Sequence, residues 1–297
     1  QKTYLQILSW KLAHGSEELQ SAQDNNINLI VNSTKIPEKK VHIKQINPNI
    51  GKRYLGVRTS CSGSDNHEYQ YRLTKAKKLA GNIATIPLSY SEAYTVYREY
   101  WQGSFNYCLP VTQFTRKQCD NIQSAIYMSL LPKMGYNRHM PRVVLASPFK
   151  YGGNNFTTYW HEQHIQHIEH FLRYIRRQCP IRKLLLAMID QFQFYLGIQK
   201  PFLTLPSTQY QYSLKSYIKY IWDACTEVKL QFYISNLYIP RSQYLNDHFV
   251  MDVFVTKNYP EWKLRRLNNV RIWKKIIFIS DMFDQHTRKI YHCVLTA

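Results

Sequence analysis

Apolar residues recur at intervals of three and four along most of the chain, which predicts amphipathic helices rather than strands. Prolines and polar breaks divide this pattern into separate segments. The pattern predicts helices over about 65–85, 89–109, 115–130, 158–177, 181–196, 212–225 and 262–277. The last of these is expected to bury Trp273, and the 158–177 helix is expected to bury Ile165.

Three of these helices begin with residue pairs at capping-box spacing, in which two side chains satisfy free backbone N–H groups. The pairs are Asp65 with Glu68, Ser89 with Glu92, and Thr115 with Gln118. Ile86-Pro87 ends the first helix, because the residue before a proline avoids helical geometry.

A different pattern, with loose alternation and β-branched or aromatic residues, occupies the N-terminal part of the chain. It predicts short strands over 1–12, 27–31, 41–46 and 51–60, and a further one over 230–234. The sequence therefore predicts a mainly α protein with a small N-terminal β portion. Because the chain begins inside an expected strand, we expect it to be part of a longer protein.

The charge balance changes this picture, because 39 Lys and Arg face only 19 Asp and Glu, a net charge of +20. Such an excess favours a polyanionic partner, nucleic acid before a membrane surface. The most apolar window, 184–198, is too short and too polar to span a bilayer. Six cysteines lack C-x-x-C spacing, which indicates free thiols in an intracellular compartment, nucleus or cytoplasm.

Cations and aromatics are interleaved most densely over residues 124–156, which contain no acidic residue. Lys133, Arg138, Arg142 and Lys150 lie there beside tyrosines and a phenylalanine, with a β-rich run after Pro141 and a Gly152-Gly153 bend. This mixture suits a sugar-phosphate backbone and its bases. The alternative is a basic surface loop on an ordinary helical domain.

Candidate catalytic groups are sparse. Asp190, Asp252 and Asp281 are isolated, and we interpret them as caps and surface acids rather than as ligands of two metal ions. Four histidines repeat every third residue from His161 to His170, so their rings drift around the helix and cannot all reach one ion. We interpret them as a polar, phosphate-facing stripe, and we predict no metal site.

Several segments, in colinear order, resemble the part of non-LTR-type retrotransposon reverse transcriptases that follows the catalytic palm. Residues 133–144 (KMGYNRHMPRVV) are the most specific part of this resemblance. The others are 54–58, 62–63, 91–94, 107–112, 122–124, 152–153, 162–163, 251–252, 267–268 and 280–281. Asn154-Asn155 departs from the family, which has Leu-Gly after the two glycines.

The resemblance implies that residues 1–60 are the trailing edge of the palm, 61–150 a thumb-like helical bundle, and 151–297 a helical extension. It also implies that Lys2 helps protonate the departing pyrophosphate. The aspartates that bind Mg²⁺ in the family would precede Gln1, in the fingers and palm. We therefore expect Mg²⁺ for the parent polymerase, no cofactor in this chain, and no polymerase activity from it alone.

On this interpretation the chain is the C-terminal fragment of an RNA-directed DNA polymerase. It binds template RNA, RNA–DNA hybrid or DNA by its phosphates. The expected contacts are Lys75, Lys78, Lys133, Asn137, Arg138, Arg142, Lys150, Arg173, Arg176 and Arg177. The alternatives are a non-enzymatic RNA- or DNA-binding module and an inert retroelement remnant.

Overall fold

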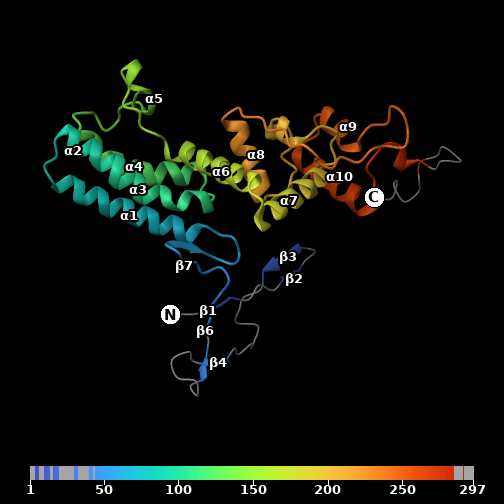
Figure 1. Ribbon diagram of the computed structural model, residues 1–297, viewed down its shortest axis with the longest axis horizontal. Coiled ribbons are helices and arrows are strands. Elements are labelled where there is room, and N and C mark those ends of the chain that lie inside the picture. Colours follow the sequence, from blue (N-terminus) through green and yellow to red (C-terminus); the bar gives the residue numbers. More distant parts are fainter. Residues whose placement is uncertain are drawn as a thin grey trace. The chain divides into compact units, whose positions relative to one another are not determined.

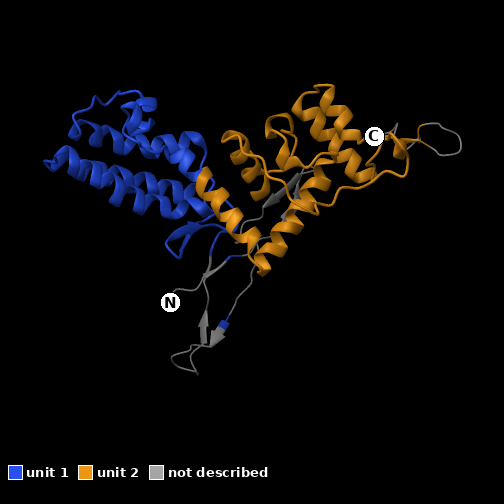
Figure 2. Ribbon diagram, turned by 45° about the horizontal axis from the view of Figure 1, so that its top comes forward, with its two compact units in different colours: residues 1–163 blue, residues 164–297 orange. Residues whose placement is uncertain are grey.

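The computed structural model describes residues 4–6, 10–13, 16–19, 30–32, 40–42, 44–283 and 290. The chain forms two compact units, unit 1 (residues 1–163) and unit 2 (residues 164–297), which Figure 2 colours separately. Helices make up most of both units, and the named strands of the described chain all precede residue 60 (Figure 1). The expected fold class, mainly α with a small N-terminal β portion, is confirmed. The expected boundaries at 60 and 150 both fall inside unit 1.

The strands of unit 1 form pairs rather than a continuous sheet. The pairs are β1 (Tyr4–Leu5) with β6 (Lys44–Gln45) in parallel, and, antiparallel, β2 (Trp10–Ala13) with β3 (Ser16–Leu19), β4 (Ile30–Asn32) with β5 (Lys40–His42), and β7 (Lys52–Tyr54) with β8 (Val57–Thr59). The single strand expected over 51–60 is therefore wrong. Leu55 and Gly56, with φ of 46° and 92°, form a tight turn there, and glycine adopts such positive φ values without strain.

Helical structure occupies the ranges predicted over 65–85, 89–109 and 115–130 in unit 1. Its helices are α1 (Asn66–Thr85), α2 (Tyr90–Thr95), α3 (Gly103–Phe105), α4 (Arg116–Lys133) and α5 (Arg142–Ala146). A π-helical run (Val96–Gln102) joins α2 to α3, and a 3-10 turn (Asn106–Val111) follows α3. The β-rich run expected after Pro141 is wrong, because α5 occupies it.

Two of the three expected capping boxes are confirmed. The Ser89 side chain accepts from the Glu92 N–H, the Thr115 side chain accepts from the Gln118 N–H, and both boxes are reciprocal. The box at Asp65 is wrong, although α1 does begin there. The Asp65 carboxylate instead accepts from the Gln113 N–H at 2.7 Å, and Glu68 is turned into the core.

The core of unit 1 lies between α1 and α4 and is closed by aromatic rings. Tyr97 stacks on Phe156 at a centroid distance of 4.0 Å, and Trp101 stacks on Phe105 at 3.9 Å. Phe156 ends the cation-rich stretch over 133–156, which we call the basic segment, so this stack attaches that segment to the helical core.

Unit 2 is built around Trp222, which is fully buried. Its helices are α6 (Tyr159–Arg176), which begins in unit 1, α7 (Pro180–Leu196), α8 (Tyr217–Glu227), α9 (Val250–Thr256) and α10 (Glu261–Lys274). Short 3-10 turns lie at Phe202–Thr204, Ser207–Gln209 and Ser280–Met282. The Trp222 indole N–H donates to the Leu205 carbonyl at 2.7 Å, so this large ring is buried without an unmet donor.

The sequence-based expectations are less accurate in unit 2. α8 begins at Tyr217 rather than near 212, α9 was not predicted, and residues 230–234 form no strand. Ile165 is 43% exposed and Trp273 is 73% exposed, so neither is buried as expected. Both errors follow from reading every apolar residue at helical spacing as a core residue.

Candidate nucleic-acid interface

The basic segment begins where α4 ends and is shaped by its own hydrogen bonds. Gly135 follows the helix with φ of 77°. The Asn137 side-chain oxygen accepts from the His139 N–H at 2.8 Å, and the Tyr136 hydroxyl donates to the Asn154 side-chain oxygen at 2.9 Å. Asn137, expected to contact nucleic acid, thus uses this oxygen to form a turn.

The Gly152-Gly153 bend folds the segment back against α5. Gly152 has φ of 76°, and a Cβ on Gly153 would lie 2.0 Å from the Ser147 carbonyl oxygen. Backbone bonds from Asn155 N–H to Ser147 and from Phe156 N–H to Leu145, both 2.9 Å, close the fold. The two glycines therefore permit a close backbone approach rather than cradling a phosphate.

Within this segment the cations are presented next to aromatic rings. The Arg142 guanidinium carbon lies 4.8 Å from the Tyr127 ring centroid, and the Lys150 ammonium lies 4.7 Å from that of Tyr151. Arg138 is exposed, and Lys133 is half-buried in the last turn of α4. Cations held over rings keep their charge and their donors available to a ligand.

A cavity of about 300 Å³, which we call the α4–α6 pocket, opens beside Arg142. Arg116 from α4, Arg142 from α5 and His161 from α6 line it, and Asp120 is the single acid among its lining residues. Its apolar walls include Leu145, Phe156 and Trp160. His161 is held in place by a hydrogen bond between its Nδ1 and the Thr158 hydroxyl. Such a pocket can accept an anionic group attached to a flat apolar ring.

The remaining predicted contacts lie elsewhere. The Lys75 ammonium is 5.1 Å from the Phe105 ring centroid, and Lys78 is exposed further along α1. Figure 1 draws α4 between α1, which carries the two lysines, and α5, which carries Arg142. Arg173, Arg176 and Arg177 are exposed at the end of α6 in unit 2. Lys2 lies outside the described residues.

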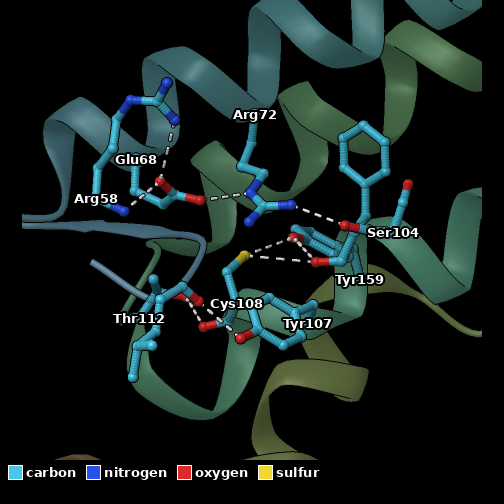
Figure 3. Close-up of polar contacts among 10 residues, drawn as sticks. Arg58, Glu68, Arg72, Ser104, Tyr107, Cys108, Thr112 and Tyr159 are labelled. Atoms are coloured by element: carbon cyan, nitrogen blue, oxygen red, sulfur yellow. Dashed lines mark hydrogen bonds and ion pairs between the residues drawn. The ribbon is translucent and has the colours of Figure 1, made fainter. Parts of the chain in front are cut away.

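A buried polar network attaches the β7–β8 hairpin to the helices of unit 1 (Figure 3). Glu68 is fully buried and accepts from the Arg72 Nε at 2.5 Å and from the Arg58 backbone N–H at 2.7 Å. Arg72 donates in turn to the Ser104 carbonyl at 2.8 Å. The Glu68 carboxylate of α1 thus holds strand β8 in place, and through Arg72 it also links α3 to α1.

Two further members of the network are inert at neutral pH. Cys108 Sγ lies 3.6 Å from the Tyr159 hydroxyl, which donates to the Phe105 carbonyl at 2.9 Å. Burial raises the pKa of both Cys108 and Tyr159, so both stay protonated. This environment suppresses a thiolate and therefore gives Cys108 a structural role.

The histidines of α6 do not form one polar stripe. His164 and His167 are each 1% exposed, and their rings lie 5.5 Å and 4.6 Å from the Tyr220 ring of α8. The interpretation of these two as phosphate-facing is wrong, because they belong to the core of unit 2. His161, which lines the α4–α6 pocket, is the member of the series placed beside a cavity.

The isolated aspartates act as backbone acceptors, but Asp190 and Asp252 bond to groups 48 and 53 positions away rather than capping a helix as expected. Asp190 accepts from the Tyr238 N–H, Asp252 from the Gln199 N–H, and Asp281 from the Ile277 and Phe278 N–H groups. No three His, Cys, Asp or Glu side chains gather at a possible metal position within the described ranges. These residues do not fit the Mg²⁺ pair of a polymerase, so no step is assigned to a metal here.

Hydropathy and homology add two negative findings. None of the helices in the described part of the chain is both long enough and apolar enough to cross a bilayer. No protein-family model matches the sequence, and no curated protein or solved structure matches it either.

Proposed function

We propose that this chain grips nucleic acid by its phosphate backbone, as the C-terminal part of a retroelement RNA-directed DNA polymerase. The observation that carries the proposal is Arg142, held over Tyr127 at a pocket shared with Arg116 and His161. The net charge of +20 and the colinear resemblance of the sequence to reverse transcriptases support it.

The chemistry follows from the side chains present. The guanidinium groups of Arg138 and Arg142 offer paired N–H donors that match two phosphate oxygens, while Lys150 offers a point charge. Such contacts position a strand without reading its sequence. We expect the partners to be template RNA, RNA–DNA hybrid or DNA. The Mg²⁺ site would belong to fingers and palm elsewhere in the same protein.

The test is binding of the full chain to a fluorescein-labelled 20-base-pair RNA–DNA hybrid across a salt series. If about six cations engage phosphates, the log–log slope of affinity against salt is roughly −4 to −5. Arg138→Ala combined with Arg142→Ala should make this slope shallower by about 2 and weaken binding equally for all sequences. Lys215→Ala with Arg241→Ala removes the same charge from exposed positions in unit 2 and is the matched control.

Three results would count against the proposal. A strong sequence preference or a flat salt dependence would exclude a backbone grip. Equal losses in the test and control variants would show that net charge alone drives binding. Single-stranded RNA and DNA duplex of the same length, measured in parallel, separate a hybrid-gripping polymerase part, which favours the hybrid, from a general nucleic-acid-binding module.

A further inference from the structure

The outer side of α10 carries two exposed tryptophans in line with each other. Trp262 and Trp273 are eleven positions apart, which on a helix is three turns plus roughly 20° and a rise of about 16 Å. Arg265, Arg266 and Asn269 lie between them at the i+3, i+4 and i+7 positions. We call these five residues the Trp–Arg face.

The opposite side of α10 explains why this face points away from the core. Leu264, Asn268 and Arg271 are buried. The Arg271 guanidinium donates to the Asn268 side-chain oxygen at 3.0 Å and to the Phe194 and Tyr195 carbonyls at 3.1 and 2.8 Å. These bonds join α10 to the C-terminal turn of α7 and fix its rotation, so both tryptophans remain outside.

The exposure of the two tryptophans within unit 2 is large. Trp262 is 67% exposed and Trp273 is 73% exposed, whereas Trp222 in the same unit is fully buried. A groove of about 640 Å³ lies along Trp262, Arg265, Arg266 and Asn269. Exposed indoles beside a groove leave their ring faces available for stacking by a ligand.

The charges around the Trp–Arg face indicate the occupant. Lys263 and Lys274 lie along one edge of this face, and the Lys274 ammonium lies 4.2 Å from the Trp273 ring centroid. Glu261, which pairs with Arg265 at 2.5 Å, is the single acid of the helix. Protein interfaces also favour tryptophan and arginine, but this excess of cations complements a polyanion.

We infer that the Trp–Arg face of α10 binds single-stranded nucleic acid. Unpaired bases stack on Trp262 and Trp273, Arg266 contacts a phosphate between them, and Lys274 contacts a phosphate beside Trp273. Stacking on an indole needs an open base face, which a single strand offers and a paired duplex does not. The inference rests on the proposed function and adds to it a contact for the unpaired template.

The test compares two labelled probes with the full chain at one salt concentration, a 20-nucleotide oligo(U) RNA and the 20-base-pair RNA–DNA hybrid. Trp262→Ala with Trp273→Ala should weaken oligo(U) binding about tenfold or more and change hybrid binding less than about twofold. Trp262→Phe with Trp273→Phe should restore most of the oligo(U) affinity, because phenylalanine still stacks. It should also remove most of the tryptophan fluorescence quenching that oligo(U) causes.

The matched control is Tyr233→Ala with Tyr238→Ala, which removes two aromatics that are 82% and 63% exposed in the same unit. An equal loss in this control would overturn the inference. An unchanged oligo(U) affinity in the tryptophan variant would also overturn it. So would a self-association that disappears in that variant without an effect on RNA, which would assign the face to a second copy of the chain.

The same measurements separate this inference from the proposed function. If Arg138→Ala with Arg142→Ala weakens hybrid binding while the tryptophan variant changes nothing, the backbone grip stands and the α10 contact fails. If the arginine variant binds hybrid normally while the tryptophan variant loses oligo(U) affinity, the α10 contact stands and the backbone grip fails.

Discussion

In the part of the chain that the structure describes, each unit buries one arginine to the same extent, but by different means. Arg72 in unit 1 and Arg271 in unit 2 are both 3% exposed. Arg72 pairs with the fully buried carboxylate of Glu68 and bonds to the Ser104 carbonyl. The bonds from Arg271 go to the Asn268 side chain and to backbone carbonyls, chiefly those at the end of α7.

These different partners accompany opposite shifts in the pKa values of the two arginines. Although burial works to lower it, nearby Cys108 and Glu68 raise the pKa of Arg72 above its ordinary value. Burial lowers the pKa of Arg271, because it removes solvent from the guanidinium. The partial negative charge at the helix C-terminus offsets that loss less than a full countercharge would. Two of the 39 cations counted in the sequence thus hold the fold and are not available to nucleic acid.

The largest expected effect in this comparison comes from removing Arg72. Arg72→Met leaves the buried Glu68 carboxylate with the partly exposed Arg58 guanidinium, 3.7 Å away, as its remaining countercharge. The free energy of unfolding should therefore fall by about 3 kcal/mol, the lower end for a broken buried ion pair. Urea unfolding followed by circular dichroism measures it. Glu68→Gln combined with Arg72→Met removes both charges and should recover more than half of the loss. A double variant as unstable as the single one would show that the network does not depend on charge balance.

Removing Arg271 should cost less, because no carboxylate is stranded. Arg271→Met loses charge-assisted bonds to Phe194 and Tyr195, and the free energy of unfolding should fall by about 1.5–3 kcal/mol. Arg266→Met on the exposed side of α10 should stay within about 0.5 kcal/mol of the wild type. A loss larger than that of Arg72→Met would contradict the distinction drawn between the two arginines.

Local helix signals were readable from the sequence because they depend on neighbouring residues. The caps at Ser89 and Thr115 involve side chains three positions apart, and the structure confirms both. The capping box predicted at Asp65 does not form, because contacts with residues remote in sequence replace it. The partner of Asp65, the Gln113 N–H, is remote in sequence, and Glu68 is drawn inward by Arg72 and the Arg58 N–H. Tertiary contacts there override a valid local pattern.

The candidate site was readable only in part. The concentration of cations over 124–156 pointed to Arg142, but Arg116 and Trp160 join it in the α4–α6 pocket through folding across remote segments. No spacing in the sequence signals that meeting. The prediction that Trp273 is buried was wrong for a related reason. The spacing of apolar residues identifies a helix and its apolar face, but the helices packed against it decide which face is covered.

The smallest expected effect concerns Asp252 of unit 2, whose carboxylate accepts from the Gln199 backbone N–H, whereas Glu68 also accepts from the buried Arg72 guanidinium. Burial raises the pKa of Asp252, so its contribution to stability is present below the ordinary aspartate range and lost as pH rises through the raised value. Asp252→Asn keeps an acceptor for the Gln199 N–H. It should therefore be more stable than the wild type at pH 7, by less than about 1 kcal/mol because solvent still screens the group. The difference between the two proteins should vanish towards pH 4 in thermal unfolding.

Asp247→Asn provides a control of opposite sign. Although burial works to raise it, the pKa of Asp247 is lowered by hydrogen bonds from Ser280 and Ser242, so that variant should lose stability at pH 7. If Asp252→Asn also loses stability at pH 7, the ionised carboxylate is stabilising there, and the contrast with the arginine-paired Glu68 disappears.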